Sequence, residues 1–216
     1  MKKLRYGNTN TFYLEGTHGG LLIDTDYAGT LPAFFKAVKS AGIGLRDISY
    51  VMATHYHPDH CGLIGELQEL GITLLLFDVQ LESVHFADGI FARDKRLKYI
   101  PVREAAAKVI SCGESRDFLQ SLGISGEIIR TPSHSEDSVS VVLDGGNCIV
   151  GDLEPLEYLY AYEDNPGLKS DWEKIMNFSP KRILYAHANE KTITYEKFRK
   201  RSPDDAGTCF GHADVF

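Results

Sequence analysis

This 216-residue sequence lacks three features, each of which would indicate a class of protein. Its four cysteines, at positions 61, 112, 148 and 209, show no paired spacing, so we expect free thiols in a reducing compartment. No apolar run reaches the length of a membrane span. Residues 1–8 include basic residues with no apolar stretch behind them, so no signal peptide is expected. We therefore predict a soluble, cytoplasmic protein without a membrane partner.

An excess of positive charge is also missing. The formal net charge at pH 7 is -7, so no general attraction to nucleic acid or anionic membranes is expected. The length suits one domain with a sizeable core, and we predict a single domain over residues 1–216. Residues 202–216 are polar and contain glycine, which indicates a loose tail. His212 and Cys209 lie in this tail and are weak site candidates for that reason.

The most informative stretch is Thr-His-Tyr-His-Pro-Asp-His-Cys-Gly at residues 54–62. The apolar run 48–53 before it predicts a buried strand, and the segment 63–70 after it predicts a helix. The stretch is therefore expected on a loop at the carboxyl end of a strand, where α/β proteins place their sites. Its candidate ligands are His55, His57, Asp59 and His60.

The spacing of these side chains favours two metal ions over one. His55 and His57 are two residues apart, so in an extended chain they point the same way and can share an ion. Asp59 and His60 follow the turn expected at Pro58 and would face a second position. Imidazole and carboxylate together suit zinc, and also iron or manganese. Three histidines and an aspartate at this spacing disfavour the alternative of surface or capping residues.

The rest of the chain alternates strands and helices in the rhythm of an α/β protein. Strands are predicted at 10–15 and 19–25 (a hairpin), 73–77, 108–111, 127–131, 138–143, 148–150 and 182–186. Helices are predicted at 30–41 (capped by Thr30), 114–122, 171–178 and 194–201.

Residues 78–106 form the least regular part, and long irregular segments are often lids or substrate loops. Aromatic residues are mixed there with arginine and lysine. One interpretation is a loop that faces an anionic substrate; the other, slightly favoured, is a solvated basic face. His85 has no evident partner nearby in the sequence and is predicted to be structural.

Further polar residues stand at the ends of predicted strands. We expect these strand ends to converge on one edge of a sheet, which would gather five histidines and two aspartates. Seven ligands exceed the four of a tetrahedral zinc ion and fit two ions with a shared carboxylate and a bridging water. Asp24 has two open roles, as a cap of the following loop and as an acceptor of a hydrogen bond from the ligand loop. The added ligand candidates are His134, Asp152 and His187.

Taken together, these motifs closely resemble those of the metallo-β-lactamase superfamily over roughly residues 4–190. The matching motifs are Leu-Ile-Asp-Thr at Asp24, His-x-His-x-Asp-His at 55–60, Thr-Pro-Ser-His-Ser at His134, Val-Gly-Asp at Asp152 and Leu-Tyr-Ala-His at His187. The resemblance implies a four-layer αββα sandwich with the site in a groove along the sheet edges. It also implies one metal on His55, His57 and His134, a second on Asp59, His60 and His187, and Asp152 as the bridge.

The favoured function is a metal-dependent hydrolase that cleaves an ester, thioester, lactone or amide bond of a small molecule, which could be anionic. Two divalent ions, zinc first and iron or manganese as options, would generate a bridging hydroxide, with Asp59 orienting it and taking or relaying its proton. One alternative is a phosphodiesterase or ribonuclease, which the basic runs 93–103 and 197–201 keep open. The other is a single-iron oxygenase that acts on persulfides. Oligomeric state stays open.

Overall fold

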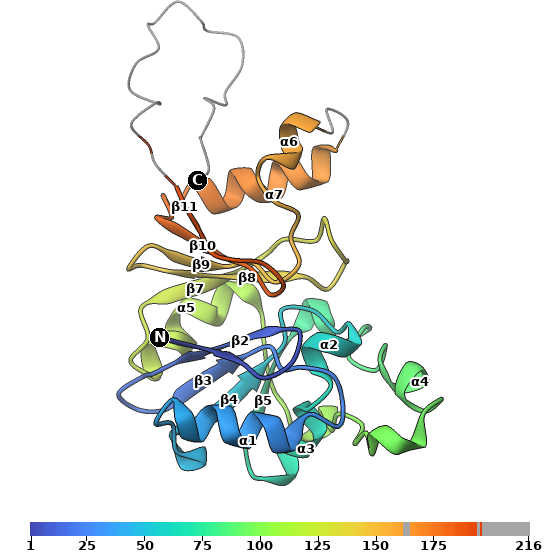
Figure 1. The fold of residues 1–216 in the computed structure, drawn as a ribbon. Helices are drawn as coiled ribbons and strands as arrows, with labels where there is room; N and C mark the ends of the chain where they lie inside the picture. Colours follow the sequence, from blue (N-terminus) through green and yellow to red (C-terminus); the bar gives the residue numbers. More distant parts are fainter. Residues whose placement is uncertain (162–164, 194, 196–216) are drawn as a thin grey trace, which may run out of the picture.

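The computed structural model describes residues 1–161, 165–193 and 195, and it contains two β-sheets that face each other between outer helices (Figure 1). The first sheet has the strand order β1-β2-β3-β4-β5-β6, with antiparallel pairing from β1 to β3 and parallel pairing from β3 to β6. Its strands are β1 (Lys2–Arg5), β2 (Asn10–Leu14), β3 (Gly20–Ile23), β4 (Ile48–Met52), β5 (Thr73–Phe77) and β6 (Lys108–Ile110).

The second sheet has the order β11-β10-β9-β8-β7, in which only β9 and β10 run parallel. Its strands are β7 (Gly126–Arg130), β8 (Val139–Leu143), β9 (Asn147–Ile149), β10 (Arg182–Leu184) and β11 (Lys191–Thr192). The α-helices are α1 (Leu31–Ser40), α2 (Pro58–Cys61), α3 (Ile64–Glu69), α4 (Asp88–Phe91), α5 (Ser115–Ser121), α6 (Tyr158–Ala161) and α7 (Pro166–Met176). Short 3-10 helices are η1 (Leu45–Asp47), η2 (Asp78–Gln80), η3 (Lys95–Leu97), η4 (Glu104–Ala106) and η5 (Cys112–Glu114).

Successive side chains of a strand pack in different layers of the core. In β3, Leu22 packs with Phe34 and Val38 of α1, whereas Leu21 and Ile23 face the second sheet. Successive side chains of a strand point to opposite faces, so a strand with apolar residues at every position must be covered on both sides. Helices α1 and α3 accordingly cover the outer face of the first sheet (Figure 1).

The second sheet follows the same rule. Val141 of β8 packs in the core between the sheets, and the next residue, Val142, packs with Trp172 of α7 on the outer face. Helix α7 lies along this outer face (Figure 1). The order helix, sheet, sheet, helix is the predicted four-layer αββα sandwich, which is confirmed.

Most predicted elements lie where the sequence places them, with six differences among the strands and α-helices. Strands β1 and β11 and helices α2, α4 and α6 were not predicted, and α7 begins at Pro166 rather than at Asp171. The side chain of Asn165 accepts a hydrogen bond from the N–H of Leu168, so an asparagine cap and a proline in the first turn define this start. Thr30 precedes α1, but its hydroxyl donates to the carbonyl of Tyr27 and does not cap the helix.

Three of the four cysteines are free thiols, as predicted, and Cys209 lies outside the described residues. The predicted helix 194–201, the predicted tail 202–216 and His212 also lie outside them. Among the residues that the structure describes, no helix combines the length and the apolar character that a bilayer crossing requires.

Candidate metal centre

The histidine-rich loop begins directly after β4. His57 has an extended backbone (φ -70°, ψ 152°) and stands at the N-cap position of α2, with Pro58 as the first helical residue. His57 therefore precedes α2 in extended backbone and His55 stands at a bend before it, whereas Asp59 and His60 lie on the first turn of the helix. The turn predicted at Pro58 is confirmed, and it directs the two pairs of side chains to different places.

The other candidate ligands come from the second sheet. His134 lies in the β7–β8 connection, Asp152 follows β9, and His187 follows β10. Because β8 is antiparallel to β9, and β9 is parallel to β10, these three positions fall at the same end of the sheet. The expected convergence on one sheet edge is therefore wrong. The site lies between the edges of two sheets, joined there by a hydrogen bond from the Val139 N–H to the Thr54 carbonyl of 2.9 Å.

Three imidazoles form a first group, which we call the first trio: His55, His57 and His134. The Nδ1 of His57 lies 3.0 Å from Nε2 of His55 and 3.2 Å from Nε2 of His134. Zinc–nitrogen bonds of about 2.0–2.1 Å place the ligands of a tetrahedral ion roughly 3.4 Å apart. The three nitrogens could therefore hold one ion with a small outward adjustment.

A second group, the second trio, consists of Asp59, His60 and His187. Nε2 of His187 lies 3.1 Å from Oδ2 of Asp59 and 3.3 Å from Nε2 of His60. Oδ1 of Asp59 lies 4.0 Å from Nε2 of His60. These separations also match the edges of a small coordination shell.

Asp152 lies between the two trios. Its Oδ1 is 3.4 Å from Nε2 of His187, in the second trio. Its Oδ2 is 3.3 Å from Nε2 of His60, 3.9 Å from His134 and 4.0 Å from His55. A carboxylate has two oxygens, so this side chain could contact an ion on each side.

Polar groups hold the ring nitrogens that point away from the centre. Nδ1 of His60 is 3.1 Å from the Asp24 carboxylate, and Nδ1 of His187 is 3.3 Å from the Asn8 carbonyl. Nδ1 of His55 is 3.3 Å from the Thr54 hydroxyl. Such partners select the tautomer and orient the ring, which leaves Nε2 available in the centre.

Asp24 connects β3 to this loop. It is fully buried, and its carboxylate accepts hydrogen bonds from the Thr54 N–H at 2.6 Å and the Thr54 hydroxyl at 3.0 Å. Of the two roles left open for Asp24, the structure shows the acceptor role. Its φ of 58° lies in the left-handed region, which aspartate tolerates better than most residues.

The carboxylates of the centre are ionised at neutral pH. The hydrogen bond from His187 lowers the pKa of Asp59 to about 2, against the opposing effect of burial. Burial acts to raise the pKa of Asp152, but the hydrogen bond and charge of His60 reverse this and lower it. Burial likewise acts to lower the pKa of His60, but Asp24 and Asp152 outweigh it and raise that pKa to about 10. In the metal-free chain the proton on His60 thus offsets part of the carboxylate charge, and a cation bound at Nε2 would replace it.

For His55 the pKa shifts in the opposite direction to that of His60. Burial and the neighbouring imidazoles, His60 first, lower its pKa far below the usual value. Burial also lowers the pKa of His134. These two members of the first trio are neutral at pH 7, the form in which imidazole binds metal.

Two buried residues that the sequence analysis missed support the loop. Asp137 accepts hydrogen bonds from the Tyr56 N–H and the Ser135 hydroxyl, both at 2.7 Å, and so links the loops of the two sheets. Gln80 donates to the carbonyls of Ala53 at 3.1 Å and Asp137 at 3.2 Å. The available signals were weak, namely a carboxylate three residues after His134 and a polar residue in the short 3-10 helix after β5.

The segment 78–106 reaches the centre through Phe86. This side chain is 55% exposed, and its ring lies 5.4 Å from the imidazole of His57. The basic residues of the segment are exposed, and Arg96 pairs with its neighbour Asp94 at 2.7 Å, which fits the solvated basic face.

His85, in the same segment, has the structural role predicted for it, although it does have a partner close in the sequence. Its Nδ1 lies 2.9 Å from the Asp88 carboxylate, and its Nε2 lies 3.6 Å from that of Glu104.

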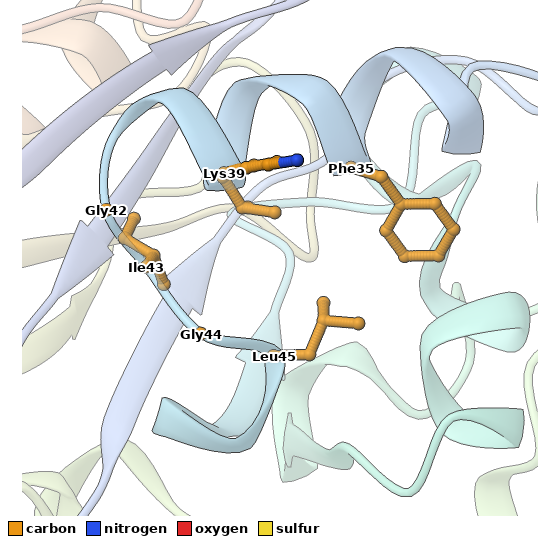
Figure 2. A pocket seen from close by; sticks show the side chains of 7 residues that line it. Phe35, Lys39, Gly42, Ile43, Gly44 and Leu45 are labelled. Carbon is orange, nitrogen blue, oxygen red and sulfur yellow. The ribbon is translucent and has the colours of Figure 1, made fainter.

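An open apolar hollow of about 470 Å³ lies elsewhere, at the end of α1 (Figure 2). Phe35, Ile43 and Leu45 contribute its apolar surface, and it includes none of the candidate ligands. The hollow is therefore not part of the candidate centre.

The family model described as the metallo-beta-lactamase superfamily matches residues 4–187. "Beta-lactamase-like protein 2 homolog" of Drosophila melanogaster is 25% identical over 187 residues, which cover 84% of this chain and 59% of that protein. The chain thus spans 59% of the length of this relative. A "Probable metallo-hydrolase" of Methanocaldococcus jannaschii is 28% identical over 159 residues, or 73% of this chain and 70% of that protein.

The fold also matches solved structures. The crystal structure of TTHA1623 in a di-iron-bound form superimposes with a TM-score of 0.65 at 23% identity. The alignment covers 89% of this chain and 94% of that chain. At this identity the likeness concerns the fold alone.

Proposed function

Because the chain belongs to the metallo-β-lactamase superfamily, we propose that it is a hydrolase that works through two divalent metal ions. The observation that carries this proposal is the placement of seven donor side chains. Two trios stand on either side of the Asp152 carboxylate, and in each trio donor atoms approach within 3.0–3.3 Å. We assign His55, His57 and His134 to one ion, Asp59, His60 and His187 to the other, and Asp152 to both.

Zinc is the first choice for both positions, since imidazole with carboxylate is a common zinc ligand set. Iron and manganese suit the same donors. The di-iron form of TTHA1623 shows that this fold accommodates iron in that protein, which keeps iron as the second choice here.

Bound ions would supply the polarisation of a carbonyl group and the acidification of a water molecule. Within this frame Asp59 has a defined role. In the metal-free chain the hydrogen bond from His187 lowers the pKa of Asp59 to about 2, so Asp59 is a carboxylate at neutral pH. A group of such low pKa is well suited to orient a water by accepting its hydrogen bond and to pass a proton on, and poorly suited to retain one.

Side-chain nucleophiles are disfavoured. The Cys61 thiol is fully buried and lies 3.3 Å from the His57 carbonyl, and burial raises its pKa far above the usual value. The Ser135 hydroxyl is engaged by the Asp137 carboxylate and by Ser138. A covalent mechanism needs a nucleophile beside a free base, and the nearby imidazoles are assigned to metal. Water is therefore the proposed nucleophile.

Phe86 points to the kind of substrate. An aromatic ring that is 55% exposed beside His57 offers an apolar surface at the edge of the centre. Burying such a ring against an acyl chain would favour binding by about 25 cal/mol for each Å² of apolar surface covered. We therefore favour a small ester, thioester, lactone or amide with an apolar acyl group.

The test is an activity screen on the purified protein loaded with zinc, manganese or iron, with the metal content measured in parallel. Expected are about two ions per chain and hydrolysis of acyl substrates. Hydrolysis confined to phosphodiesters would instead support the phosphodiesterase or ribonuclease. Oxygen consumption with a persulfide, by protein that holds a single iron, would support the oxygenase. Metal-loaded protein without any of these activities would refute the proposed enzyme.

A further inference from the structure

We propose that residues Asn8, Thr9 and Asn10, which we call the amino-terminal strap, position the second trio and thereby set the affinity for one of the two ions. The strap joins β2 of the first sheet to the end of β10 in the second. It is predicted to control the second ion and to leave the first nearly unaffected. This inference rests on the two-ion centre proposed above.

Two consecutive residues of the strap hold two of the three ligands. The Asn8 carbonyl is 3.3 Å from Nδ1 of His187, so this nitrogen can donate to it while Nε2 faces the centre. The Thr9 hydroxyl donates to the backbone carbonyl of Asp59 at 2.7 Å. Thr9 is fully buried, so this bond is protected from competition by water. The ligands from the two sheets are thus held by one short piece of chain.

Asn10 fixes the backbone around His187. Its side-chain amide donates to the carbonyls of Tyr185 at 2.9 Å and Ala188 at 3.1 Å, on either side of the histidine. Its backbone N–H donates to the Ala186 carbonyl at 2.7 Å. Asn10 is 1% exposed, and a primary amide has the two donors that this arrangement uses.

The strap is itself anchored. The Thr9 N–H donates to Oδ2 of Asp26 at 3.1 Å, and Oδ1 of Asp26 accepts from the Tyr27 N–H at 2.6 Å. Asp26 is 3% exposed, and a Cβ at Gly7 would collide with its carboxylate. Buried hydrogen bonds to Asp26 hold the strap in place, so it can give its ligands a fixed position.

The first trio has different supports. His55 is oriented by the Thr54 hydroxyl, and its loop is held by the hydrogen bond from the Tyr56 N–H to Asp137. Within the part of the chain that the structure describes, the hydrogen bonds of the strap reach Asp59 and the backbone around His187, and none reaches His134. Weakening the strap should therefore lower the affinity for one ion and leave the affinity for the other nearly unchanged.

The decisive variant is Thr9→Ala, which removes the hydroxyl from Asp59 without adding bulk. Thr11→Ala is the matched control: Thr11 is fully buried close by in β2, but its hydroxyl contacts Tyr6, away from the trios. Thr9→Ser restores the donor. Loss of a partner that orients a metal ligand typically weakens metal binding about 10- to 100-fold.

The assay is calorimetric titration of the metal-free full chain with zinc, together with thermal melting. In Thr9→Ala we expect about 10- to 100-fold weaker binding of one ion and a change below about 3-fold for the other. Thr11→Ala should bind both ions like the wild type, and Thr9→Ser should recover the loss. Asn10→Ala should show the same selective weakening, which provides a second variant if Thr9→Ala is poorly folded.

Equal effects of Thr9→Ala and Thr11→Ala would overturn the inference, as would equal weakening of both ions or a failure of Thr9→Ser to recover binding. If the wild-type chain binds two ions and any one of these three results is found, the strap alone is refuted. A wild-type chain that binds fewer than two ions refutes both the two-ion centre and the strap.

Discussion

Replacing Asp24 by asparagine tests how much of the centre depends on a buried charge. The carboxylate is fully buried and has three donors around it: the N–H and hydroxyl of Thr54, at 2.6 and 3.0 Å, and Nδ1 of His60 at 3.1 Å. Asparagine keeps the shape and tolerates the φ of 58°, so backbone strain hardly changes. Asparagine replaces one carboxylate oxygen, which accepts hydrogen bonds, by an NH2 group, which donates them. This NH2 group must then face at least one of the three donors.

The magnitude follows from these contacts. Hydrogen bonds to charged groups contribute about 1.5–3 kcal/mol each, and an unsatisfied buried donor costs about 1–3 kcal/mol. With one bond lost and the charge removed, we expect Asp24→Asn to lower the free energy of unfolding by roughly 3 kcal/mol. In a domain of this size the melting temperature should fall by roughly 6–12 °C. His60 also loses its orienting charge, so one ion should bind about 10- to 100-fold more weakly.

Urea unfolding of the metal-free protein measures the first quantity, and zinc titration measures the second. Asp47→Asn is a suitable control, because Asp47 is exposed and accepts a bond from the Gly44 N–H at 2.8 Å, and it should cost less than about 1 kcal/mol. If Asp24→Asn unfolds within about 0.5 kcal/mol of the wild type, the range of ordinary surface substitutions, and binds zinc normally, the reasoning is refuted.

Three further outcomes are expected. Asp59→Asn keeps the shape of the side chain but removes the charge that orients water, so turnover measured at matched metal content should fall by roughly 100- to 10,000-fold; undiminished turnover would contradict this role. Phe86→Ala should lower kcat/KM for hexanoyl substrates more than for acetyl substrates, so that the ratio of the two values falls by about 10-fold. Phe86→Leu should lower this ratio less. An unchanged ratio would exclude a contact between Phe86 and the acyl group. Because Asp24 and Asp152 raise the pKa of His60 to about 10 from 6.5, the stability contributed by protonated His60 is present below pH 6.5 and lost as the pH rises through 10 in the metal-free protein. At pH 8, zinc should therefore displace roughly one proton from His60, a number that calorimetry in buffers of different ionisation enthalpy measures and that should fall toward zero above pH 10.

Local patterns predicted much of the fold. The β-branched and apolar runs at 48–53 and 73–77 form β4 and β5. A strand that is covered on both faces has apolar residues at most positions, and these runs have that pattern. Strand β1 was missed because only Leu4 of its four residues is buried, which leaves little apolar periodicity. The apolar pattern predicts a start of α7 at Asp171, but the Asn165 cap and the fixed φ of Pro166 begin the helix at Pro166.

The sequence by itself determined the kinds of donor atoms and the strand-to-helix loop that carries four of them, because both are local properties of residues 54–62. It also indicated that His134, Asp152 and His187 follow strands. Only the tertiary structure decided that these three belong to a second sheet, since the order of residues along a chain does not specify which strands pair.

The supports of the centre were also decided by the tertiary structure. Asn10 contacts the backbone at Tyr185 and Ala188, more than 170 positions away, and Asp24 contacts Thr54. An asparagine or aspartate at such a position looks locally like a turn or cap residue. Its role exists only when folding brings its partners within hydrogen-bond distance and removes the water that would otherwise satisfy it.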